Sequence, residues 1–221
     1  MERKARCRSW PLLELPPSEQ ARLFVDINAE QRKVKQSLLQ ELYAELHWDA
    51  QGPDVRVQAI LSKAIQALDV DPESPFRNRI LKADESRTNT RCISLTSVFS
   101  AMERSGFFIA KMKKGQVVEY GPLWAVDNMS TLKRTLVVLI SYFGSIRKEA
   151  LDIWEKGSAE GGGLAMNDGV TVCINELRSI IHHLQTVKRL PLADLANEEL
   201  VREITPFSEL VGRHFALMSS N

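Results

Sequence analysis

The sequence is poor in cysteine, has almost no net charge and lacks an apolar segment of membrane-spanning length. Its three cysteines, Cys7, Cys92 and Cys173, lie far apart and form no C-x-x-C pair, which argues against a disulfide framework and a zinc knuckle. The 29 Lys and Arg residues nearly balance the 28 Asp and Glu residues, so a formal net charge of +1 gives no global attraction for nucleic acid or anionic membranes. The longest apolar run, 136–142, is much too short to cross a bilayer, and no apolar run of signal-peptide length precedes Pro16. We therefore expect a cytoplasmic chain with reduced thiols and no membrane contact.

The sequence also lacks the common motifs of nucleotide, metal and nucleophile sites. There is no G-K-[S/T] and no G-x-G-x-x-G, so the glycine run 161–163 is interpreted as a connector rather than a phosphate cradle. No G-x-S-x-G and no Cys/His arrangement suggests a nucleophile. His182 and His183 would point about 100° apart on a helix, so they cannot readily chelate one ion. We expect no catalytic residue, no metal and no cofactor.

The apolar residues that are present recur mostly at helical spacing. With 221 residues, 44% of them hydrophobic and 26% charged, the chain is long enough for one sizeable core. The pattern indicates a mainly α-helical single domain of about seven or eight helices with one small β-hairpin. Caps, glycines and prolines place the predicted helices over 18–28, 37–48, 54–68, 94–106, 130–156, 167–184, 194–204 and 206–218. Ser94 is the predicted N-cap of the fourth of these helices, and Asn167 and Asp168 are the predicted caps of the sixth.

Residues 107–120 carry the strand signature. Phe108, Ala110 and Met112 alternate with other residues, and the turn 113–116 separates them from a second short apolar stretch. A helical extension of the preceding segment is the alternative interpretation. The stretch 74–91 is polar and is predicted to be irregular.

Three clusters of cations are candidates for nucleic-acid binding. Duplex binding needs several cations gathered on one face, whereas scattered cations are usually solvated surface, so both interpretations stay open. The first cluster is Arg32, Lys33 and Lys35, the second Arg77, Arg79, Lys82, Arg87 and Arg91, and the third Lys111, Lys113 and Lys114 at the predicted hairpin turn.

One stretch, L-F-V-D-I-N-A-E-Q-R-K-V at 23–34, carries a specific pattern of residue types, F-x-x-I-N-x-x-Q. The amides of this pattern are Asn28 and Gln31, and Asn28 is also a residue type that commonly ends a helix. The stretch resembles a segment of the DGQHR-domain family, which includes DndB-like regulators of DNA phosphorothioation. The continuation at 33–38 and the turn at 163–170 are similar to that family too, and the resemblance spans most of residues 12–188.

The resemblance implies an incomplete version of such a protein, because D-G-Q-H-R itself is absent. The chain then corresponds to the helical part that packs on an α/β, ParB-like core in full-length relatives. Residues 1–17 would be a basic, proline-rich lead-in, 18–188 the helical DGQHR-type region and 189–221 short C-terminal helices. Any nucleotide-hydrolysing activity tied to the missing motif is not expected here.

The function implied by the resemblance is regulatory binding of DNA or partner proteins in a bacterial DNA-modification or defence system. If the α/β core is absent, the first helices would expose Leu23 and Phe24 and promote self-association. The alternative is a non-catalytic protein-interaction module, or a truncated remnant, without DNA affinity. The candidate binding residues are Asn28, Gln31, Arg32, Lys33, Arg77, Arg79 and Lys82.

Overall fold

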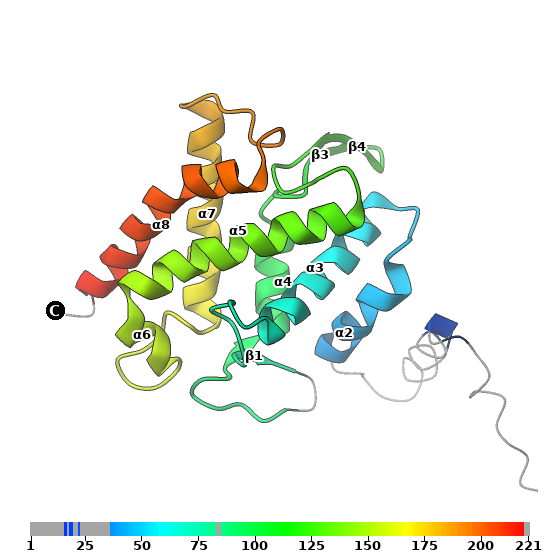
Figure 1. Cartoon of the computed structure of the whole chain (residues 1–221). Helices are drawn as coiled ribbons and strands as arrows, with labels where there is room; N and C mark the ends of the chain where they lie inside the picture. Colours follow the sequence, from blue (N-terminus) through cyan, green and yellow to red (C-terminus); the bar gives the residue numbers. More distant parts are fainter. Residues whose placement is uncertain (1–15, 17, 20–21, 23–35, 83–84, 219–221) are drawn as a thin grey trace, which may run out of the picture.

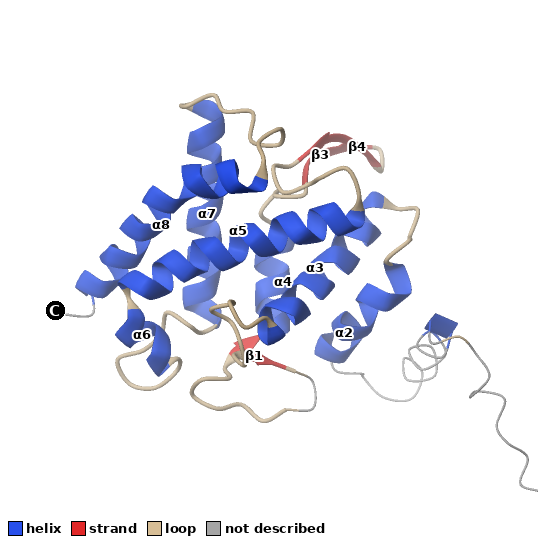
Figure 2. Cartoon of the chain, in the orientation of Figure 1, coloured by secondary structure: helices blue, strands red, loops and turns tan. Residues whose placement is uncertain are grey.

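A computed structural model describes residues 16, 18–19, 22, 36–82 and 85–218. Helix accounts for 59% of the structure and strand for 8%, which confirms the mainly α class (Figure 2). The first predicted helix, 18–28, lies mostly outside the described residues. The described elements are α2 (Gln36–His47), α3 (Pro53–Val70), β1 (Ile80–Leu81), β2 (Ile93–Ser94), α4 (Leu95–Glu103), β3 (Ile109–Lys113), β4 (Gln116–Tyr120), α5 (Asn128–Glu149), α6 (Leu151–Lys156), α7 (Asn167–Thr186) and α8 (Asn197–Met218).

Helix α5 is the central element of the fold. In Figure 1 it crosses the front of the molecule, with α8 and α3 packed along it and α4 and α7 on the far side. Phe143 of α5 contacts Phe76 edge-on at a ring-centroid distance of 4.7 Å, and Phe76 contacts Trp154 at 5.7 Å. All three aromatic side chains are at most 1% exposed, so they form the centre of a core to which α3 to α8 contribute.

The predicted long helix 130–156 is wrong in one respect, because it is two helices. Ala150 leaves the helical conformation at φ −126° and ψ 45°, and α6 starts at the next residue. The change of direction places Trp154 in the core, where its indole Nε1 donates to the Pro75 carbonyl at 3.3 Å. Burial of this large side chain explains a break that helical periodicity alone does not predict.

The C-terminal region differs from prediction in the opposite sense, since the two helices predicted over 194–204 and 206–218 are one helix, α8, which begins at Asn197. Pro206 lies inside α8, although it has no N–H to donate to the preceding turn. The helix continues through the proline because Leu200, Ile204, Ser208 and Gly212 all face the interior, four residues apart. Packing of α8 against α5 therefore outweighs the lost hydrogen bond.

The stretch predicted to be irregular, 74–91, contains β1, which pairs in parallel with β2. Ser94 caps α4 as predicted, since its hydroxyl accepts from the Ser97 N–H at 3.1 Å. Asn167 does not cap α7 as predicted; its Oδ1 accepts from the Ser94 N–H at 2.7 Å instead. One amide thus joins the starts of α4 and α7.

The predicted hairpin is confirmed as β3 and β4, an antiparallel pair. Lys114 and Gly115 form its tip with φ angles of 51° and 77°, the left-handed conformation that two-residue hairpin turns require. The strands are almost entirely exposed, and Figure 1 places them at the edge of the molecule. Buried Phe107 and Phe108 fix the hairpin to the core at its base.

Candidate nucleic-acid interface

The candidate residues of the first helices lie outside the part of the chain that the structure describes. This applies to the amides Asn28 and Gln31 and to the cations Arg32 and Lys33. Leu23 and Phe24, expected to promote self-association, fall in the same undescribed segment. Their roles stay predictions.

Arg79 of the second cluster does not lie on the surface. It is 7% exposed, its guanidinium pairs with the carboxylate of Glu155, and Nη1 donates to the Trp154 carbonyl at 3.2 Å. These contacts tie the turn before β1 to α6. The Arg79 charge is thereby used inside the protein and is not presented to a phosphate.

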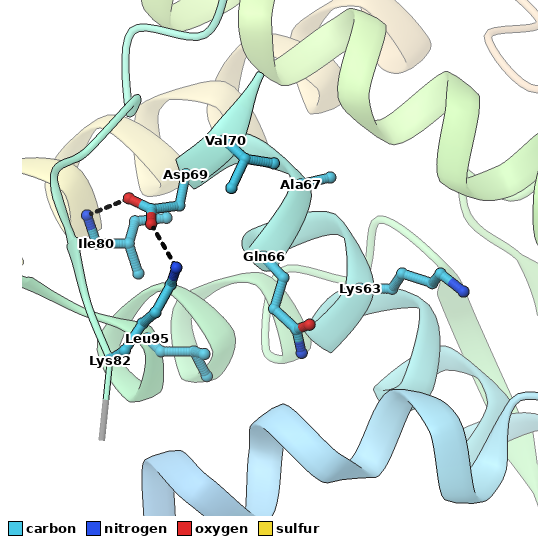
Figure 3. A pocket seen from close by; sticks show the side chains of 8 residues that line it. All are labelled: Lys63, Gln66, Ala67, Asp69, Val70, Ile80, Lys82 and Leu95. Atoms are coloured by element: carbon cyan, nitrogen blue, oxygen red, sulfur yellow. Dashed lines mark hydrogen bonds and ion pairs between the residues drawn. The ribbon is translucent and has the colours of Figure 1, made fainter. Parts of the chain in front are cut away.

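Lys82 also points toward an internal partner, as Figure 3 shows. Its Nζ lies 3.3 Å from Oδ2 of Asp69, a residue that is 1% exposed. The other oxygen of that carboxylate accepts from the Ile80 N–H at 3.0 Å. The ion pair closes one side of a cavity of about 480 Å3 between α3, β1 and α4. Because Lys82 compensates a buried carboxylate, its net contribution to an anion site is small.

The Arg91 guanidinium is also paired within the protein. It pairs with Glu85, and its Nε and Nη2 donate to the carbonyl and side-chain oxygens of Asn78 at 3.3 Å and 3.2 Å. The hydrogen bond from Arg91 holds the pKa of the Glu85 carboxyl below its usual range. Arg77 and Arg87 are the exposed members of the second cluster.

The third cluster is fully displayed at the surface. Lys111, Lys113 and Lys114 are all exposed on the hairpin, and none of them makes an ion pair with another described residue. Glu119 stands opposite Lys111 in the strand register and compensates its charge in part. The two cations at the tip, Lys113 and Lys114, have no acidic residue opposite them.

The hairpin base carries an aromatic pair, Tyr120 and Trp124, that was not predicted from the sequence. The rings of Tyr120 and Trp124 stack at a centroid distance of 4.5 Å and an interplanar angle of 15°. Arg56 of α3 lies over the Trp124 ring, with its Cζ 5.9 Å from the centroid. The sequence feature that could have indicated this pair is two aromatic residues four positions apart, on either side of the turn at 121–122. The first of them is the last residue of β4, which pairs with the lysine-bearing strand β3.

A second surface feature lies along α5. An apolar groove of about 520 Å3 follows the outer face of the helix and ends beside the C-terminus of α3. Its residues recur three and four positions apart, which places them on one stripe of the helix. The lining residues are Asp71, Met129, Leu132, Lys133, Leu136, Val137, Ile140 and Ser141.

The described residues include no metal-binding cluster, and the Cys173 thiol is not activated as a nucleophile. Burial raises the pKa of the Cys173 thiol to about 12, so it stays protonated at neutral pH. Within residues 36–82 and 85–218, no cluster of three His, Cys, Asp or Glu side chains could hold a metal ion. The helices in this part of the chain include none that is long and apolar enough to cross a membrane.

In comparisons with known proteins, no family model, no curated protein and no solved structure matches the chain.

Proposed function

We propose that this protein binds nucleic acid through the β3–β4 hairpin. The observation that carries the proposal is the display of Lys113 and Lys114 at an exposed tip, where no carboxylate opposes them. A two-stranded ribbon is narrow enough to enter the major groove of DNA, and lysines on it neutralise phosphates. In the second cluster, by contrast, Arg79, Lys82 and Arg91 are paired with carboxylates of the protein itself. Arg77 and Arg87 are the exposed members of that cluster.

The biological role in this proposal is that of a DGQHR/DndB-like regulator in a bacterial DNA-modification or defence system. The residue pattern around Asn28 and Gln31 supports it. In this proposal the activity of the chain is binding. The DNA would be a regulatory site, and the protein would act from the cytoplasm.

The test is a titration of a short labelled duplex with the purified chain, followed by fluorescence anisotropy at about 50 mM and about 200 mM salt. Reversing the hairpin charges with Lys113→Glu and Lys114→Glu is expected to weaken binding strongly at the lower salt. The matched control reverses Arg77 and Arg87, which changes the net charge equally on another surface. Absence of binding by the wild-type chain at about 50 mM salt would contradict the proposal.

A second candidate function is supported by the groove on α5. A half-buried apolar groove on a helix is typical of surfaces that receive an amphipathic helix from a partner protein. In that function the chain is a non-catalytic interaction module without DNA affinity. The same titration separates the two candidates, because a pure interaction module does not bind the duplex at either salt concentration.

A further inference from the structure

The aromatic pair at the hairpin base suggests which form of nucleic acid the hairpin binds. We propose that Tyr120 is a stacking surface for an unpaired base, so that the hairpin binds single-stranded nucleic acid in addition to duplex DNA. This inference rests on the proposed function and adds a second ligand class to it. In a duplex, the faces of the bases are covered by their neighbours, whereas an unpaired base can place its face on an aromatic ring.

The geometry of the pair suits this role. Trp124 covers one face of the Tyr120 ring at a centroid distance of 4.5 Å, and Tyr120 nevertheless remains 40% exposed. A base added to the exposed face would extend an existing stack of two rings. Stacking of this kind tolerates any base, because every base has a π-face.

The pair is held rigidly before any ligand binds. The Gly121 N–H donates to the Phe108 carbonyl at 2.8 Å, and the Leu123 N–H donates to the Phe107 carbonyl at 2.8 Å. Both phenylalanines are at most 2% exposed. The backbone between the two stacked rings is therefore anchored to the core, and little conformational entropy is lost when a base stacks.

Cations lie on both sides of this stack. Arg56 lies over Trp124 and makes no ion pair with any other described residue. At the other end, Lys113 pairs with Gln116, which is four residues from Tyr120, a separation of roughly 13 Å along a strand. A single strand of several nucleotides can span that distance with its phosphates near the cations.

Acidic residues nearby limit the path of such a strand. Asp54 and Glu103 line a separate cavity of about 240 Å3 together with Met112 of the hairpin. Phosphates are repelled from that side of the hairpin. We therefore place the strand between the hairpin tip and Arg56, across Tyr120.

The test uses three labelled oligonucleotides of equal length: oligo-dT, oligo-rU and an abasic oligonucleotide that carries the same phosphates without bases. Wild-type protein is expected to bind oligo-dT and oligo-rU about tenfold more tightly than the abasic strand, because stacking contributes only where bases exist. Tyr120→Leu is expected to remove that preference and leave abasic binding unchanged. Tyr120→Phe keeps the ring and is expected to behave as wild type.

Equal affinity of the wild-type chain for oligo-dT and the abasic strand would overturn the inference, and this comparison needs no variant to fold. Unchanged oligo-dT binding by a folded Tyr120→Leu protein would overturn it too. If a duplex binds in a manner that depends on Lys113 and Lys114 while the abasic strand binds as well as oligo-dT, only the stacking inference fails. If no nucleic acid binds at about 50 mM salt, the proposed function fails with it.

Discussion

At the residue scale, a buried arginine, Arg134, joins three segments of the fold by hydrogen bonds. The Arg134 guanidinium is 5% exposed and donates to the carbonyl oxygens of Pro122, Leu192 and Leu195 at 2.6 to 2.8 Å, and to Oδ1 of Asn197 at 3.0 Å. It thereby joins α5 to the loop after the hairpin and to the start of α8. Burial lowers the pKa of this guanidinium, which remains charged at any ordinary pH.

Replacing this arginine is expected to destabilise the fold. In Arg134→Lys, one ammonium with three donors cannot satisfy four acceptors in these positions, and carbonyl groups in the interior lose their partners. The free energy of unfolding should fall by about 2–4 kcal/mol, as measured by urea denaturation. The neighbouring exposed Lys133 provides the control, since Lys133→Ala is expected to change it by at most about 0.5 kcal/mol. Equal stabilities of the two variants would contradict the role assigned to Arg134.

A second prediction at this scale concerns the acid dependence of α5. Asp127 caps the helix, because its two carboxylate oxygens accept from the N–H and hydroxyl of Ser130, each at 2.8 Å. These bonds lower the pKa of Asp127. A lowered pKa means that the stabilisation is present above the unfolded-state pKa and is lost as the pH falls through the folded-state value.

The matching experiment compares melting temperatures at neutral pH and at about pH 3. Asp127→Asn keeps a capping oxygen but cannot titrate, so its melting temperature should fall less on acidification than that of the wild type. Asp127→Ala should melt lower than wild type at neutral pH. A variant Asp127→Asn with the same acid-induced decrease as the wild type would refute the assignment.

At the element scale, the crossing of α5 and α8 depends on a glycine. A Cβ at Gly212 would lie 2.7 Å from the Cβ of Glu149 and 3.0 Å from the carbonyl oxygen of Ile146. Gly144, also on α5, has open space where its Cβ would be. The two glycines therefore form a natural pair for comparison.

We expect alanine to act in opposite directions at the two positions. Gly212→Ala pushes the helices apart and should lower the free energy of unfolding by about 1–3 kcal/mol. Gly144→Ala meets nothing and should raise it by about 0.5–1 kcal/mol through helix propensity. Urea denaturation of both variants tests this, and a change of the same sign in both would show that steric contact at the crossing is not the cause.

The elements themselves divide into those that local sequence determines and those that it does not. Amphipathic periodicity was enough to predict α3, a capping serine helped to predict α4, and a turn glycine helped to predict the β3–β4 hairpin. The break at Ala150 and the continuity of α8 through Pro206 depend on which side chains reach the core, and this information is not contained in the local pattern. Helix boundaries set by distant packing are therefore the ones that the sequence analysis placed wrongly.

At the scale of the whole molecule, the same limit applies to the candidate site. Arg79 and Lys82 look like surface cations in the sequence, but their partners Glu155 and Asp69 are 76 and 13 residues away, and only the folded chain brings them together. The lysines at the hairpin tip were predictable, because a tight turn must be exposed. The stack of Tyr120 on Trp124 was not, since it depends on the path of the turn between them.

The salt dependence of duplex binding tests the central claim, that the hairpin tip is the nucleic-acid contact, most directly. The slope of log Kd against log salt counts the phosphates that the protein neutralises, at about 0.9 per contact. We predict that reversing Lys113 and Lys114 lowers this slope by about two, whereas reversing Arg77 and Arg87 leaves it within error of the wild-type value. An unchanged slope for the hairpin variant, or an equal decrease for both variants, would contradict the claim.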